Sequence, residues 1–334
     1  MSLSDLRERF VDAIDREIDA WISLTEAAPI FQDMLRYQLG FVDANLQPRQ
    51  APGGKRFRPI LCLLATEGAG GDWREALPAA ASIELLHNFS LIHDDIEDHD
   101  PERHHRPTVW KLWGEPQAIN AGDGMFALAG RAVLAATQDP EVANEVAEAY
   151  QDTSFKLTEG QYLDMSFESR ESVSAGEYVR MIDLKTGALV AFSTWSGAAI
   201  GGGGDDVRHA LREFGLLLGR AYQIHDDIMG IWGSKEATGK EAGMDLRNRK
   251  KTLPLLISLE RSSADQADTL QAFFSGRSDD LDEVRKVLGV TGARDEAERQ
   301  VQASLDAALE ALDRAHLERE ATAGLRDLAR ELTG

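Results

Sequence analysis

An identical pentapeptide, Ile-His-Asp-Asp-Ile, occurs at residues 92–96 and again at residues 224–228. Both copies lie in apolar stretches with the period of a helix, and in the first copy Asp94 and Asp98 lie one turn apart on the same side. Like charges on an otherwise buried helix are costly unless a cation compensates them. Carboxylates without His or Cys suit Mg²⁺, which completes its shell with substrate phosphate oxygens. The two copies supply five candidate metal ligands: Asp94, Asp95, Asp98, Asp226 and Asp227.

Basic residues accompany both acidic clusters. The turn Gly-Gly-Lys-Arg-Phe-Arg-Pro at residues 53–59 opens a predicted helix and is suited to bind an anion. Residues 103–106, Arg-His-His-Arg, follow the first acidic cluster, and Gly239-Lys240 and residues 247–251 follow the second. Each basic group alone is more typical of an ordinary surface, but their recurrence beside both acidic clusters indicates phosphate binding. A solvated acidic helix end, the alternative for one isolated cluster, does not account for two.

Helices must position these residues, because apolar side chains recur with the helical period through nearly the whole chain, beginning with Leu6, Phe10 and Ile14. The C-terminal third is rich in the strong helix formers Ala, Leu, Glu and Arg. No alternating β-branched run bounded by turn residues occurs, and the breaks, including residues 99–107, are of loop length. We therefore predict an all-α fold, a single large bundle of antiparallel helices, in one domain over residues 1–334.

Composition excludes several classes of function. The chain has 334 residues and a net charge of −21, which argues against nucleic acid as a partner. The single cysteine, Cys62, lies in an apolar run and is expected to be a buried thiol. The N-terminus lacks the pattern of a signal peptide, and no apolar stretch is long enough for a transmembrane helix, so a cytoplasmic location is expected.

Taken together, these motifs resemble those of the trans-isoprenyl diphosphate synthases, or polyprenyl synthetases, over roughly residues 50–260. The resemblance implies the isoprenoid synthase fold, in which the helices surround a central active-site cavity, and a homodimer. The implied cofactor is Mg²⁺, with three ions in each active site when substrate is bound. It also implies two substrates: isopentenyl diphosphate and an allylic diphosphate, which is dimethylallyl, geranyl or farnesyl diphosphate. The Mg²⁺-bound allylic diphosphate would ionise, and isopentenyl diphosphate would attack the resulting cation. The released diphosphate is the expected base, because no side chain is a convincing one.

The resemblance also assigns roles to individual residues. The residues that correspond to the isopentenyl diphosphate site are Lys55, Arg58, His87, Arg103 and His104. Those that correspond to the allylic diphosphate and cation site are Lys185, Thr186, Gln223, Lys240 and Lys250. Asp226 matches the principal ligand of the second motif.

Two departures from the family pattern stand out. His104 replaces a second arginine, whose charge Arg106 is a candidate to supply, and the second acidic motif ends in Gly230 instead of Asp.

Phe89 and Ser90 precede Asp94 by five and four residues, and one helical turn of about 5.4 Å is close to the length of a prenyl unit. We therefore expect both to face the growing chain, with the Phe89 ring as a floor that favours a C20 product, as in geranylgeranyl diphosphate synthases. The alternatives are a C15 product and a floor made by another helix, with Phe89 an ordinary core residue.

Other functions remain as alternatives. A class I terpene cyclase would use an acidic cluster and Mg²⁺ but would not need the Lys55 and Arg58 site for a second diphosphate. A noncatalytic subunit of a prenyl synthase is favoured by His104 and Gly230 and opposed by the intact first acidic motif.

Overall fold

The structure is a computed structural model that describes residues 2–24, 28–49, 54–233 and 244–334. The helices of its first half are α1 (Leu3–Ser23), α2 (Pro29–Leu39), α3 (Phe57–Gly68), η1 (Trp73–Ala76), α4 (Leu77–Glu97), α5 (Val109–Trp113), α6 (Glu115–Val133) and α7 (Pro140–Ser169). Those of the second half are α8 (Ala175–Ile182), η2 (Asp183–Gly187), α9 (Ala188–Ile200), α10 (Asp205–Trp232), α12 (Met244–Arg247), α13 (Leu253–Arg261), α14 (Ala264–Phe274), α15 (Leu281–Val290), α16 (Ala293–Arg314) and α17 (Arg319–Leu332). The predicted all-α class is confirmed.

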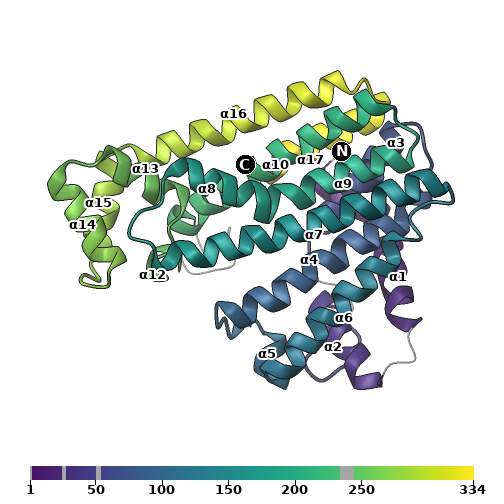
Figure 1. The fold of residues 1–334 in the computed structure, drawn as a ribbon, viewed down its shortest axis with the longest axis horizontal. Coiled ribbons are helices and arrows are strands. Elements are labelled where there is room, and N and C mark those ends of the chain that lie inside the picture. The colour runs from purple at the N-terminus through teal and green to yellow at the C-terminus, as the bar shows by residue number, and fades with distance from the viewer. Residues whose placement is uncertain (1, 25–27, 50–53, 234–243) are drawn as a thin grey trace.

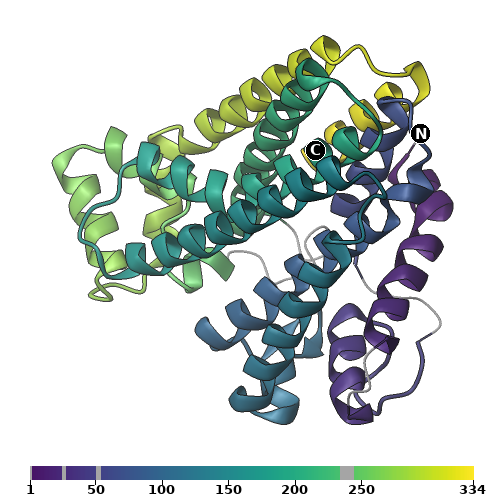
Figure 2. The same cartoon turned by 45° about the vertical axis from the view of Figure 1, so that its right-hand side comes forward.

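Two clusters of buried apolar side chains hold the helices together, and the long helices α10 and α16 contribute to both. Along α10, Phe214 and Leu218 belong to the first cluster, whereas Ile224 and Ile228 belong to the second. In both views α14 and α15 lie at the far end of the molecule from α1 and α2 (Figure 1 and Figure 2). The part of α10 that carries the second acidic motif therefore lies in the second cluster, away from the N-terminal half of that helix.

None of the described helices combines the length and the apolar character that a bilayer crossing needs.

A short hairpin corrects the prediction of a plain loop at residues 99–107. The strands β1 (Glu102–Arg103) and β2 (Arg106–Pro107) pair antiparallel across the turn residues His104 and His105. Both turn residues have a positive φ, 50° and 59°, as a two-residue hairpin of type I′ requires. Two-residue strands are too short to leave an alternating pattern in the sequence, so only the structure reveals them.

Close contact between α3 and α9 depends on a glycine. A Cβ atom on Gly197 would lie 2.2 Å from the carbonyl oxygen of Cys62 on α3. Cys62 itself is fully buried, and burial raises the pKa of its thiol to about 12, with a small opposing effect from Ser196. The interpretation of Cys62 as a buried thiol is confirmed.

We expect Gly197→Ala to lower the stability of the fold by about 1–3 kcal/mol, because the added methyl group forces α3 and α9 apart. Gly289→Ala in α15 is the matched control, since nothing lies within 4 Å of a Cβ at that helical position. Chemical denaturation of the two variants measures the difference. Equal stabilities would contradict the close contact.

Candidate functional site

The first acidic cluster lies at the C-terminal end of α4 and is surrounded by cations. Lys250 Nζ donates to Asp98 Oδ2 at 3.0 Å, and Lys185 Nζ in η2 donates to Asp164 Oδ2 on α7 at 2.6 Å. Burial raises the pKa of Asp94, although the charge of Lys185 opposes the rise. Burial alone would lower the pKa of Lys185, but Asp94 and Asp164 outweigh it and raise that pKa. Carboxylates and ammonium groups therefore stabilise one another here.

Asp95 has a different environment from its neighbours. Its side chain is only 1% exposed, and its Oδ1 accepts a hydrogen bond from Arg103 Nε at 2.7 Å. Burial raises the pKa of Asp95 to about 6, against the opposing charge of Arg103. The structure therefore does not place Asp95 with Asp94 and Asp98 but makes it the support of Arg103 on the hairpin.

The second copy of the pentapeptide repeats this arrangement. Asp226 is exposed, whereas Asp227 is 3% exposed. The Asp227 carboxylate accepts hydrogen bonds from Tyr178 Oη at 2.7 Å, Gln223 Nε2 at 3.2 Å and the backbone N–H of Leu253 at 3.3 Å. In both copies, therefore, the second aspartate is buried and holds groups from neighbouring elements.

In the described parts of the chain, no group of three or more His, Cys, Asp or Glu side chains lies close enough to hold a metal ion. Asp95 and Asp227 face other partners, which accounts for this. The assignment of the five aspartates as metal ligands stays a prediction.

A π-helical turn places the next pair of predicted residues. The turn, η2, contains Lys185 and Thr186, and Thr186 Oγ1 donates to Gln223 Oε1 on α10 at 2.8 Å. A Cβ atom on Gly160 of α7 would lie 2.4 Å from the backbone nitrogen of Lys185, so only a glycine lets the turn approach α7 this closely. Single π turns in helices occur frequently at functional sites, where the wider turn re-aims side chains.

The residues assigned to isopentenyl diphosphate also meet. Arg58 Nη1 donates to His87 Nε2 at 3.1 Å, and the charges of Arg103 and His104 also act on His87. Burial, followed by these positive charges, holds the pKa of His87 well below its usual range, so the ring is neutral. Burial also lowers the pKa of Arg58, whose Nε has no partner within the described chain. Two half-buried arginines, one of them with an unused donor, favour the binding of an anion here.

Lys55 and Arg58 flank a structural arginine. Arg56 is buried and donates to Asp15 Oδ1 at 2.9 Å and to Glu84 Oε1 at 2.6 Å. These ion pairs hold the turn before α3, while Lys55 is exposed and its charge acts on His225 of α10. The turn therefore points its two outer basic residues to the site and its middle one into the protein.

The suggestion that Arg106 replaces the missing family arginine is wrong. Arg106 Nη2 donates to the backbone carbonyls of Tyr37 at 2.9 Å and Val42 at 3.1 Å. Its guanidinium also stacks over the Tyr37 ring, 4.1 Å from the centroid. The Arg106 side chain is therefore engaged with α2 and the segment after it, and it points away from the position that the resemblance gives to the second arginine.

Phe89 and Ser90 face different directions. The Phe89 ring lies 5.1 Å from the Phe126 ring of α6 and 4.8 Å from the His93 ring. Ser90 Oγ donates to the backbone carbonyl of His87 at 2.8 Å. Phe89 and Phe126 line a hollow of about 520 Å³ whose other walls come from α7. The expectation that Phe89 and Ser90 face a growing chain stays a prediction. Phe126 lines the same hollow as Phe89.

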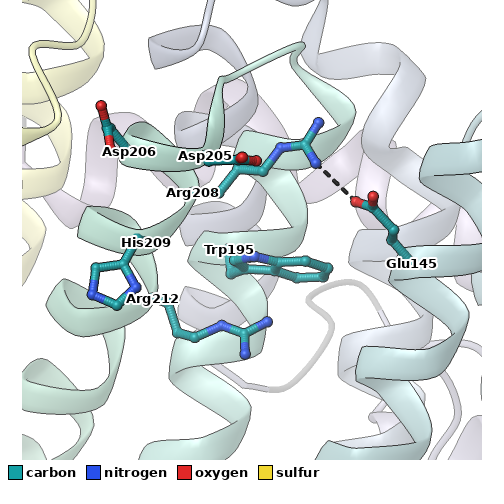
Figure 3. Close-up of a pocket in the computed structure, with 7 residues that line it drawn as sticks. All are labelled: Glu145, Trp195, Asp205, Asp206, Arg208, His209 and Arg212. Carbon is teal, nitrogen blue, oxygen red and sulfur yellow. Dashed lines mark hydrogen bonds and ion pairs between the residues drawn. The ribbon is translucent and has the colours of Figure 1, made fainter.

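Another hollow, of about 480 Å³, lies between α7, α9 and the start of α10 (Figure 3). Arg208 pairs there with Glu145 at 2.8 Å, and Arg212 stacks on Trp195, 4.6 Å from the ring centroid. None of the predicted site residues lines this hollow, so it is separate from the candidate site.

Comparison with known proteins identifies the family. A model of the polyprenyl synthetase family matches residues 42–290. The chain belongs to this family. A (2E,6E)-farnesyl diphosphate synthase of Mycobacterium tuberculosis is 44% identical over 227 residues, which are 68% of this chain and 63% of the mycobacterial protein. The chain thus matches less than two thirds of that relative's length.

Solved structures agree with the assignment. A polyprenyl synthetase from Streptomyces coelicolor has a TM-score of 0.91 and 33% identity, and the match covers all of both chains. A geranylgeranyl pyrophosphate synthase from Corynebacterium glutamicum, complexed with isoprenyl diphosphate and magnesium, has a TM-score of 0.85 and 27% identity. That match covers 100% of this chain and 99% of the other. The predicted family and the isoprenoid synthase fold are confirmed.

Some site residues escaped the sequence analysis, and one predicted residue is not described. Asp164 follows Gly160 by four residues, so both lie on one face of α7, and this spacing was an available signal. Tyr178 carries no comparable signal, because an isolated tyrosine in a helix is an ordinary core residue. Lys240 lies outside the described residues.

We expect the stability of the wild-type protein to fall more steeply than that of His87→Gln when the pH drops below about 6.5. Below about pH 6.5 the His87 ring takes up a proton in the unfolded chain but stays neutral in the folded protein, because its pKa is lowered there. The free energy of unfolding therefore falls as the pH drops from the pKa of His87 in the unfolded chain to its lower pKa in the folded protein. Glutamine retains an acceptor for Arg58. Melting temperatures between about pH 7.5 and pH 5.5 measure the effect, with the exposed His316→Gln as the control. Parallel pH profiles for all three proteins would contradict a neutral His87.

Proposed function

We propose that the chain is a short-chain trans-prenyltransferase that condenses isopentenyl diphosphate with an allylic diphosphate. The observation that supports this most is the presence of two separate cationic sites. One contains Arg58 and Arg103 around the neutral His87, and the other contains Lys185 and Lys250 beside the first acidic cluster. Two diphosphates require two such sites, whereas a terpene cyclase requires one.

The acidic residues fit Mg²⁺ by their chemistry. Asp94 and Asp98 offer oxygen ligands only, and burial raises the pKa of Asp94, so a nearby cation would stabilise its charged form. Mg²⁺ held by Asp94, Asp98 and Asp226 would neutralise the leaving diphosphate, and we propose three ions in each site. The magnesium in the Corynebacterium complex supports this assignment.

The chain's own residues would bind and orient the substrates. Arg58 and Arg103, with Lys55 at the entrance, hold isopentenyl diphosphate, and the Arg58 hydrogen bond occupies the acceptor nitrogen of His87. His87 is therefore not available as a base at that atom, which favours the released diphosphate as the proton acceptor. Thr186 and Gln223, which are hydrogen-bonded to each other, would orient the allylic group, as the resemblance implies.

We propose a C20 product, with Phe89 as the floor of the site. The Phe89 ring packs edge-on against the His93 ring and at a tilt against the Phe126 ring, so α6 helps to hold it in place. The geranylgeranyl synthase among the similar structures favours C20, and the farnesyl synthase of Mycobacterium favours the C15 alternative.

We also propose a homodimer, as the family resemblance implies. Large apolar side chains on the outer faces of α6 and α7 support it, among them Ile119, Phe155 and Tyr162. A cytoplasmic location and a single domain remain proposals. A noncatalytic subunit is the second candidate, because the structure leaves His104 without help from Arg106.

The main test is turnover of isopentenyl diphosphate with dimethylallyl or farnesyl diphosphate and Mg²⁺ by the wild type and by Asp94→Ala. We expect the variant to lose activity to the background level and to keep a melting temperature close to that of the wild type, because Asp94 is only partly buried and Lys185 keeps its ion pair with Asp164. The exposed Asp268→Ala is the control. Absence of product from the wild type with both starters would favour the noncatalytic subunit.

We expect Phe89→Ala to lengthen the products beyond those of the wild type, because removal of the ring opens the space toward Phe126. Chain-length analysis of the dephosphorylated products measures this. Phe274→Ala, in the second apolar cluster, controls for general loosening of the fold. An unchanged product profile in Phe89→Ala would assign the floor to another helix.

A further inference from the structure

We propose that Tyr178 is a positioning residue for the allylic diphosphate site, an inference that rests on the proposed function. Tyr178 lies in α8, the helix directly before the π-helical turn, and its side chain is 5% exposed. Its hydroxyl donates to Asp227 Oδ2 at 2.7 Å, the shortest of the three hydrogen bonds that reach this carboxylate from Tyr178, Gln223 and Leu253. Tyr178 therefore acts on the site through Asp227.

The carboxylate determines the orientation of the Gln223 amide. An ionised carboxylate only accepts hydrogen bonds, so Gln223 must turn its NH₂ group to Asp227 and its carbonyl oxygen to Thr186. This arrangement aligns a hydrogen-bond chain from Thr186 in η2 through Gln223 to Asp227. If Asp227 shifts or rotates, Gln223 loses the partner that defines its orientation, and Thr186 loses its acceptor.

The Asp227 carboxylate also fixes the start of α13, the helix that follows Lys250. Asp227 accepts from the backbone N–H of Leu253, the first residue of α13, whose N-cap residue Thr252 makes no side-chain capping bond. Lys250 lies three residues before Leu253 and reaches Asp98 with its Nζ atom. Asp227 therefore connects Gln223 of α10 with the segment of Lys250, whose Nζ atom reaches the first acidic cluster. Tyr178 orients Asp227 from the neighbouring helix α8.

The isopentenyl diphosphate pocket lies outside this network. Arg58, His87 and Arg103 interact with one another and with Asp95, and none of their described hydrogen bonds involves Tyr178 or Asp227. Loss of the Tyr178 hydroxyl should therefore affect one substrate and spare the other. This selectivity separates positioning from a general loss of stability, which would affect both substrates.

The test compares Tyr178→Phe with the wild type in two measurements. We expect kcat/KM for farnesyl diphosphate to fall about tenfold, within the range for a lost hydrogen bond to a charged group, while the KM for isopentenyl diphosphate stays within about twofold. Calorimetry with farnesyl thiodiphosphate, an unreactive analogue, should show similarly weakened binding, with isopentenyl diphosphate binding unchanged. Tyr150→Phe is the matched control, because that buried tyrosine donates to the backbone carbonyl of Phe126 and has no described hydrogen bond to Asp227, Gln223 or Thr186.

A double variant tests the route through Asp227. If Tyr178 acts through this carboxylate, Tyr178→Phe adds no further loss in farnesyl diphosphate kcat/KM or analogue binding when Asp227→Asn is already present. Additive losses, or equal effects on the two substrates, would overturn the proposal, as would unchanged analogue binding in Tyr178→Phe. If the wild type binds both ligands but makes no product from farnesyl or dimethylallyl diphosphate, the proposed catalysis fails, and selective weakening of analogue binding still supports the role of Tyr178. If the wild type binds neither ligand, both proposals are wrong.

Discussion

Burial of negative charge is the constraint on which this structure depends. Carboxylates on two apolar helices are stable only where a cation or a hydrogen-bond donor meets them, because desolvation of an unpaired charge is costly. Arg103 donates a hydrogen bond to Asp95, Lys250 donates one to Asp98, and Tyr178 donates one to Asp227. Each partner comes from a different element, so the aspartates determine where the hairpin, the Lys250 segment and α8 lie against the two helices.

Helical geometry gives the two aspartates of each Asp-Asp pair different surroundings. Adjacent residues on a helix differ by about 100° in direction, so the two carboxylates of a pair face different surroundings. In the second pair the difference is plain, because Asp226 is exposed while Asp227 is buried. Asp95 and Asp227 are both buried, and each holds a group from another element. The repeated pentapeptide therefore places its second aspartate in the same kind of buried, hydrogen-bonded environment in both helices.

Glycines allow η2 to pack closely against α7 and α10. Gly160 admits the backbone of Lys185, and Gly219 of α10 lies against Gly187 at the end of the π turn, where a Cβ would be 2.7 Å from the Gly187 Cα. These contacts bring η2 between α7 and α10, so that Lys185 reaches Asp164 on one side and Thr186 reaches Gln223 on the other. Close packing of η2 against both helices therefore holds Lys185 and Thr186 in place.

The sequence by itself determined the helical class, the family and the residues of both charge clusters. Helical periodicity and the spacing of Asp94 and Asp98 are local properties, and the recurrence of basic residues beside both acidic motifs is visible without a fold. Only the tertiary structure decided which partner each charged residue of these clusters contacts. Whether Arg106 turns to the site or to the carbonyl of Tyr37 depends on a contact across 69 residues, and the support of Asp227 by Tyr178 depends on one across 49. Burial and hydrogen bonding between elements distant in the chain determine these choices, and no local pattern encodes them.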